Sequence, residues 1–116
     1  MINYHAQLVE ALNKIGLPVK YEMTLHSGDA TPLISYMETN NYVIGNGDTV
    51  GYSRVQYQIK VWGNSIEVLQ RYAKDIDNIL RPIGFIRTSS NELYDPNSAM
   101  IQKIMIYEGL GYEEFD

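Results

Sequence analysis

The sequence predicts an α+β fold: a single antiparallel sheet of four to five strands with two helices packed on one face. Three features of the 116 residues support it. Two segments repeat apolar residues at the spacing of an amphipathic helix, and several others alternate apolar and polar residues, as half-buried strands do. The strands also follow one another in runs, giving the order α-β-β-β-α-β-β, which antiparallel hairpins connect most simply.

The first helix is predicted over residues 4–15, and Pro18 prevents its continuation. Its apolar stripe consists of Tyr4, Leu8, Ala11, Leu12 and Ile15. Over residues 19–25 the period changes to two, which predicts the first strand. A more weakly patterned second strand is predicted at residues 33–38.

Residues 39–52 are predicted to form a long connection, because they are rich in Gly, Asn and Asp. Within it, residues 42–44 have the composition of a strand extension, and Asn46-Gly47 is a hairpin-turn signal. The clearest strand follows at residues 53–62. Its apolar positions alternate with Arg54, Gln56, Gln58 and Lys60.

The second helix is predicted from residue 66 to about residue 81, after Asn64 or Ser65 as the N-cap, and Pro82 stops it. The last two strands are predicted at residues 84–88 and 100–108, joined by a polar loop. We therefore expect one domain over residues 1–108 and an acidic tail over residues 109–116.

Charge and composition exclude several classes of protein. Nine basic against 14 acidic residues give a net charge of −5, opposite in sign to a protein that grips nucleic acid through phosphates. Without cysteine there is no disulfide scaffold, thiol nucleophile or thiolate metal site, as expected for a reducing compartment. No apolar run approaches 18 residues, so we expect no signal peptide and no membrane span.

No cluster of residues predicts catalysis. The glycine-rich residues 45–51 lack the lysine of a phosphate-binding loop and lead into a strand rather than a helix. His26 and Asp29 offer at most two metal ligands, and Asp75 and Asp77 are two apart on one helix and point to different sides. We therefore expect no catalytic, metal-binding or cofactor-binding residue, no cofactor and no enzymatic activity.

The ten tyrosines are the most informative part of the composition. Tyr21, Tyr57 and Tyr72 fall on core-facing stripes. Four others lie in predicted loops and the tail, where exposed tyrosines are typical of protein contacts. The residues predicted to form a protein interface are Tyr42, Asn46, Asp48, Tyr52, Tyr94, Leu110, Tyr112 and Phe115.

Several runs of residues together resemble a known family. They are Val55-Gln-Tyr-Gln-Ile-Lys-Val-Trp62, the helix through Ala73-Lys-Asp-Ile76, Gly84-Phe-Ile-Arg87, Leu93-Tyr-Asp95 and Ile106-Tyr-Glu108. Over residues 3–108 the chain resembles the tail terminator, or tail completion, proteins of long-tailed bacteriophages and their prophage remnants, sometimes called minor capsid proteins. The order of elements carries this resemblance more than any single motif does.

The resemblance implies a structural role in the tail or neck of a virion, assembled in the cytoplasm of a bacterial host. Such proteins form a ring, here expected to be a hexamer, on the head-proximal end of the tail tube. The ring ends polymerisation of the tube and offers a docking face to the head. The implied partners are further copies of the chain, the major tail tube protein and a head connector or stopper protein. DNA would pass through the lumen without specific binding.

Two alternatives stay open from the sequence. The nearer one is another neck component, such as a head-completion or adaptor protein between portal and tail. The more distant one is a small-molecule-binding or enzymatic α+β domain, which would need a pocket with converging polar groups.

Overall fold

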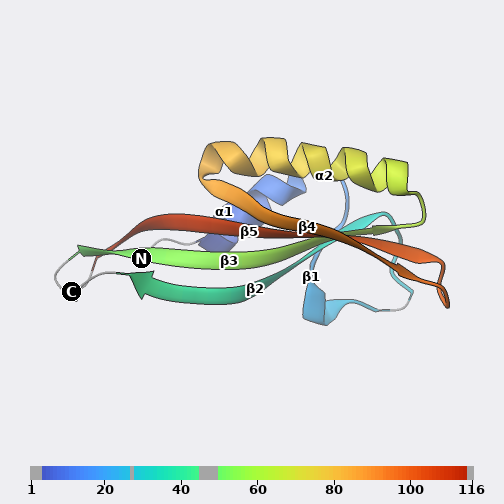
Figure 1. Ribbon diagram of the computed structural model, residues 1–116, viewed down its shortest axis with the longest axis horizontal. Helices are drawn as coiled ribbons and strands as arrows, with labels where there is room; N and C mark the ends of the chain where they lie inside the picture. Colours follow the sequence, from blue (N-terminus) through green and yellow to red (C-terminus); the bar gives the residue numbers. More distant parts are fainter. Residues whose placement is uncertain (1–3, 27, 45–49, 115–116) are drawn as a thin grey trace.

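The computed structural model describes residues 4–26, 28–44 and 50–114, and the side chains of residues 4–26, 28–40 and 54–109. Within these residues, two α-helices lie on one face of a five-stranded sheet (Figure 1). The helices are α1 (Tyr4–Asn13) and α2 (Ile66–Leu80), with short 3₁₀ turns η1 (Glu22–Thr24) and η2 (Arg81–Ile83). The strands are β1 (Val19–Tyr21), β2 (Leu33–Ile44), β3 (Val50–Gly63), β4 (Phe85–Asp95) and β5 (Met100–Glu114).

The α+β prediction is confirmed, with one correction to the sheet. The strand order is β1-β2-β3-β5-β4, and β1 pairs with β2 in parallel, whereas the other three pairs are antiparallel. The sheet is therefore mixed rather than purely antiparallel. Residue alternation does not report strand direction, and the connection over residues 22–32 is long enough to return the chain to the start of β1.

The strand predicted over residues 19–25 ends early, at Tyr21. The chain then turns through η1, where the Thr24 hydroxyl donates to the Tyr21 carbonyl oxygen at 2.7 Å and the Leu25 N–H donates to the Glu22 carbonyl oxygen at 3.2 Å. These local bonds replace the sheet ladder. Such competition between hydroxyl side chains and ladder bonds is invisible to a period-two pattern.

Three segments predicted as loops or tail are strands. The strand extension predicted at residues 42–44 is confirmed as the end of β2. In addition, residues 39–41 belong to β2 and 50–52 to β3, residues 89–95 belong to β4, and residues 109–114 extend β5 along β3. Each segment is polar or glycine-rich, but each continues a pairing that is already in register. Backbone hydrogen bonds to the neighbouring strand therefore decide its conformation, not side-chain composition.

The core lies between the helices and the sheet. α1 buries Tyr4, Leu8, Ala11 and Leu12 as predicted, but it ends at Asn13, so Ile15 of the predicted stripe lies beyond the helix and is half-buried. α2 buries Leu69, Ala73, Ile76 and Leu80, and the turn after it ends at Gly84, whose φ of 97° lies in the left-handed region. The facing strands contribute a complementary apolar surface. Fully buried side chains include Leu8, Leu12, Leu69, Ile76 and Leu80 from the helices, and Ile34, Val55, Ile59, Val61 and Met105 from the sheet.

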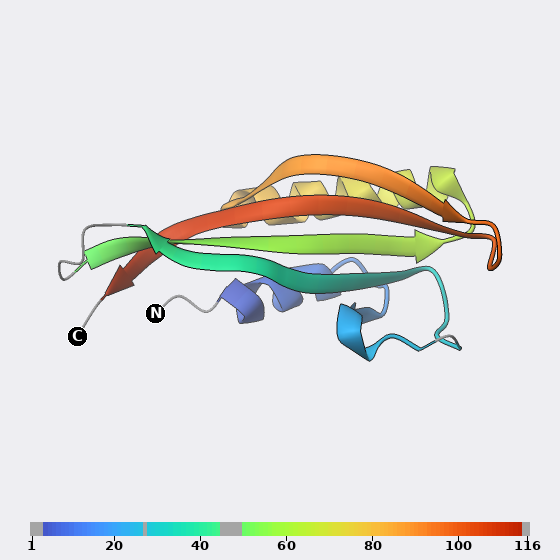
Figure 2. The same cartoon turned by 60° about the horizontal axis from the view of Figure 1, so that its bottom comes forward.

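The molecule is long and narrow, at 51 × 25 × 22 Å. Its radius of gyration of 15.5 Å exceeds the roughly 13 Å expected for a compact chain of this length. Figures 1 and 2 show the reason: the ends of β2, β3 and β5 project beyond both helices. We call this projection, residues 41–44, 50–53 and 110–114, the arm.

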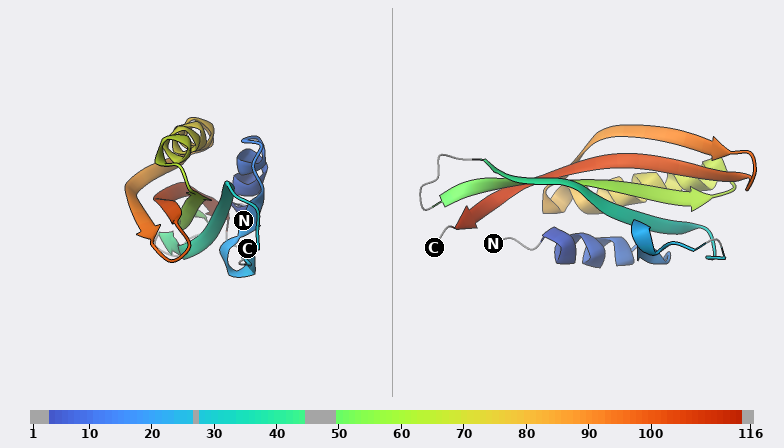
Figure 3. Two further views of the ribbon diagram at one scale, coloured as in Figure 1. Left: turned by 90° about the vertical axis from the view of Figure 1, so that its right-hand side faces the viewer. Right: turned by 90° about the horizontal axis from the view of Figure 1, so that it is seen from below.

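The helices cover different parts of the sheet. α2 packs over β3, β4 and β5, and α1 lies towards β1 at the other edge (Figure 3). On the opposite face η1 contacts the sheet, where the Glu22 carboxylate pairs with the Lys60 ammonium at 3.2 Å. The arm and the outer edge of β4 are thus left without a helix against them in the described part of the chain (Figures 2 and 3).

Candidate protein interface

Strand β4 forms one edge of the sheet and pairs on one side with β5. Every residue from Ile86 to Asp95 is exposed, and the large apolar side chains among them are Ile86 at 66%, Leu93 at 56% and Tyr94 at 61%. A long edge strand without proline or lysine presents unpaired N–H and C=O groups to other chains, a liability that monomeric proteins usually remove. Its one irregularity is a bulge between Arg87 and Ser89. The outer side of β4 is therefore a candidate surface for contact with another strand.

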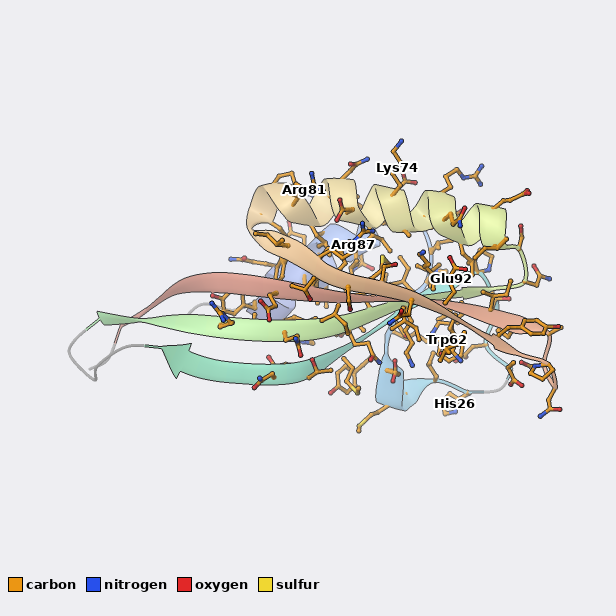
Figure 4. All side chains as sticks on the ribbon, in the orientation of Figure 1. His26, Trp62, Lys74, Arg81, Arg87 and Glu92 are labelled. Carbon is orange, nitrogen blue, oxygen red and sulfur yellow. The ribbon has the colours of Figure 1, made fainter. Side chains whose placement is uncertain are left out.

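A polar groove of about 240 Å³ runs beside this edge, between α2 and β4. We call it the α2–β4 groove. It is lined by Gln70, Ala73, Lys74, Asp77, Arg87 and Lys103 (Figure 4). Three of these six residues are basic and one is acidic, so the groove is positive in a chain that is negative as a whole.

Ion pairs at the rim use some of these charges. The Lys103 ammonium lies 3.0 Å from the Glu92 carboxylate and holds the pKa of that carboxyl below its usual value. Asp77 pairs with Arg81, the first residue of η2, and accepts a hydrogen bond from the Tyr107 hydroxyl at 3.1 Å. Among the described residues, no carboxylate lies within ion-pair distance of Arg87. The Arg87 guanidinium is therefore available to a ligand or partner.

The Tyr107 side chain ties the groove to the core. It is fully buried, and its burial, with Asp77 next to its hydroxyl, raises the pKa of Tyr107 well above the ordinary value of 10.0. Burial likewise raises the pKa of Tyr57. Both phenols therefore stay protonated and serve as fixed hydrogen-bonding parts of the core rather than as acid–base groups.

A second cavity, of about 330 Å³, lies on the opposite face at the end of the sheet. Trp62, Leu33 and Met100 supply apolar lining, and Asp29 and Asp95 lie at its margin. The Trp62 indole is held in place, because its Nε1–H donates to the buried Ser35 Oγ at 2.8 Å and the Lys60 ammonium lies 5.3 Å from its ring centroid.

The two residues considered as metal ligands lie beside this cavity. The Asp29 carboxylate accepts from the Lys20 ammonium at 2.8 Å and from the backbone N–H of His26 at 2.7 Å, and Lys20 lowers the pKa of that carboxyl. The carboxylate is thus engaged by the turn itself. In residues 4–26, 28–44 and 50–114, no three His, Asp or Glu side chains gather in an arrangement that would hold a metal ion.

The structure separates the predicted interface residues into two ends of the molecule. In the arm, the register places Tyr42 opposite Arg54 and Arg54 opposite Leu110, and it places Tyr52 opposite Tyr112. Tyr94 lies near the other end, opposite Ile101. The remaining predicted interface residues, Asn46, Asp48 and Phe115, lie outside the described residues.

Sequence reasoning missed two sets of residues. The first is two further buried tyrosines: besides Tyr57 and the predicted Tyr4, the core takes Tyr36 and Tyr107, and Tyr107 could have been found from its alternation with Met105. The second is the groove, whose lining comes from three elements distant in the chain. No local pattern in the sequence marks that set.

No helix in the described part of the chain combines the length and apolar character needed to span a bilayer.

Comparisons with known proteins give a fold and not a family. No protein-family model matches the chain, and no curated protein matches it either. Among solved structures, a similar chain occurs in one described as "Virion of native gene transfer agent (GTA) particle". The TM-score is 0.74, the alignment covers 95% of this chain and 95% of that chain, and the sequence identity is 10%. The chain therefore shares its whole fold with a component of that particle.

Proposed function

We propose that this chain is a structural protein of a phage-like virion. The observation that carries the proposal is the fold, which matches a chain of a gene transfer agent virion over 95% of both lengths. The described surface supports it: the long exposed edge of β4 and the projecting arm are features for contact with other proteins.

Within the virion, we propose the role of tail terminator. A ring is built from heterologous contacts, so each copy must present two different patches to its two neighbours. The arm at one end, and the β4 edge with its groove further along the molecule, supply two such patches. The ring would cap the tail tube, contact the major tail tube protein below and a head connector or stopper protein above, and let DNA pass through its lumen.

The test is the length of tails made without this chain. When the gene is disrupted in the phage or prophage that encodes it, tails viewed by electron microscopy should extend well beyond their normal length, because tube polymerisation is no longer stopped. A wild-type copy supplied in trans should restore normal lengths.

The same experiment separates the nearest alternative. Loss of a head-completion or adaptor protein would leave tails of normal length that fail to join heads. Normal-length, unattached tails would therefore place the chain elsewhere in the neck and contradict the terminator role.

A small-molecule function would depend on the cavity beside Trp62. A thermal shift of the wild-type chain with a metabolite, lost in Trp62→Ala, would favour that function over a structural one.

A further inference from the structure

We propose that the acidic end of the arm of one copy docks in the α2–β4 groove of a second copy. This inference deepens the proposed function, because it assigns the subunit contact on which a ring would rest. The charges of the two surfaces, their separation within one copy and the free edge beside the groove all favour a second copy of the chain as the occupant.

Charge is the first argument. Within residues 41–44, 50–53 and 110–114 the only charged residues are Glu113 and Glu114, and the nearest basic residue, Arg54, lies at the base of the arm, opposite Tyr42 and Leu110. The groove has the opposite character, since Lys74, Lys103 and Arg87 line it with Asp77 alone as an acid. Lys103 and Asp77 already have partners in Glu92 and Arg81. Among the described residues, Lys74 and Arg87 have no ion-pair partner, so they are the cations that a carboxylate from outside would meet.

Distance is the second argument, because it excludes a contact within one copy. Arg87 pairs with Tyr107 across β4 and β5, and Glu113 lies six residues further along β5. At about 3.4 Å per residue, this separation is about 20 Å along one strand. The backbone of Glu113 is therefore too far along the strand from Arg87 for a contact within one copy.

The shape of the site is the third argument. The groove lies along the strand whose outer N–H and C=O groups have no strand partner in the described residues, and the incoming arm is itself made of strands. A strand that adds to an edge gains backbone hydrogen bonds, and flanking side chains then set which strand is accepted. Arg87, which lines the groove, is placed to set that choice.

The test uses cross-linking between purified copies, because the chain contains no cysteine and engineered thiols stand alone. One copy carries Ser53→Cys in the arm, and the other carries Gln70→Cys in the groove. A bismaleimide with a flexible spacer, added at millimolar protein, should join them several-fold faster than it joins Ser53→Cys to the control Gln7→Cys. Gln7 is a matched control, since it is also an exposed glutamine on a helix.

Charge reversal completes the test. Arg87→Glu in the Gln70→Cys copy should reduce cross-linking to the rate of the Gln7→Cys control, and Glu113→Lys with Glu114→Lys in the other copy should restore it. Equal rates for Gln70→Cys and Gln7→Cys would overturn the inference. The inference would also be overturned if Arg87→Glu abolished binding of duplex DNA but left the cross-linking rate unchanged, since the groove would then be a phosphate site.

The outcome is independent of the tail-length experiment. Cross-linking requires only the purified chain, so a negative result with overlong tails in the disrupted strain removes this contact and leaves the terminator role. Cross-linking as expected, together with tails of normal length in the disrupted strain, would support this contact and contradict the terminator role.

Discussion

At the scale of single residues, the Tyr107 hydroxyl links the buried core to the α2–β4 groove by donating to Asp77 at 3.1 Å. Tyr107→Phe keeps the ring and removes this bond, and we expect a loss of about 1–2 kcal/mol in the free energy of unfolding at neutral pH. Urea denaturation measures it. Tyr94→Phe, on the exposed β4 edge, is the matched control and should leave the stability unchanged.

The raised pKa of the same phenol predicts how stability changes with pH. The folded chain holds the hydroxyl protons of Tyr57 and Tyr107 more tightly than the unfolded chain does, since burial raises the pKa of both phenols above 10.0. The contribution of these two phenols to the free energy of unfolding is complete below pH 10. It is lost as the pH rises above 10, because the unfolded chain then releases protons that the folded chain keeps. Tyr107→Phe should therefore lose less stability than wild type between pH 9 and pH 11. An equal loss would contradict this assignment.

Gly109 allows β5 to pass close to an aromatic cluster. A Cβ at this position would lie 2.8 Å from Phe85 Cε1 and 3.4 Å from Tyr4 Cε1. Phe85 is buried and in edge-to-face contact with Tyr4, so it has little room to move. Gly109→Ala should cost about 1–3 kcal/mol by overpacking, whereas Gly28→Ala, which meets no atom within 4 Å, should be nearly neutral. The difference in thermal midpoints between the two variants measures the effect.

At the scale of elements, the contact proposed for β4 can be tested without destabilising the fold. Ile86→Lys with Leu93→Lys places two charges on exposed positions of this strand. We expect the stability to change by less than about 0.5 kcal/mol, because neither side chain is buried. Tail capping should be lost, because the charges block strand addition. The measurement is the length of tails made when the double lysine variant is supplied to the disrupted strain.

The control for this prediction is Met23→Lys. Met23 is exposed at 79% on η1, away from β4. The Met23→Lys variant should restore normal tail length in the disrupted strain as the wild-type chain does. Full capping by the double lysine variant would show that the β4 edge is not a contact.

The elements also show which parts of the fold can be predicted from the sequence. Apolar periodicity found both helices and the centre of β3 because burial itself imposes the period. It failed in β4, where residues 89–95 are polar and exposed and only the pairing with β5 keeps them extended. It also missed the parallel β1–β2 pair, since a three-residue strand carries no signal of direction.

At the scale of the whole molecule, the candidate interface was only partly accessible to sequence reasoning. The tyrosines of the arm were picked out by their number and position, and the structure places Tyr52 and Tyr112 opposite each other. Arg87 and Lys103 were not picked out, because they belong to different strands and become neighbours of α2 only through folding. A surface that three elements build has no counterpart in local sequence.

The two-ended surface also predicts when the chain assembles. We expect the purified chain to be a monomer of 13.3 kDa at micromolar concentration and to form rings only on the end of a tail tube. A contact made by a strand edge and few charges must offset the large cost of immobilising a free subunit. A tube end holds several copies side by side and raises their effective concentration to the millimolar range. Light scattering coupled to size-exclusion chromatography measures the mass. A stable hexamer at micromolar concentration, without tubes, would mean that the arm and groove bind more strongly than charge and edge pairing explain.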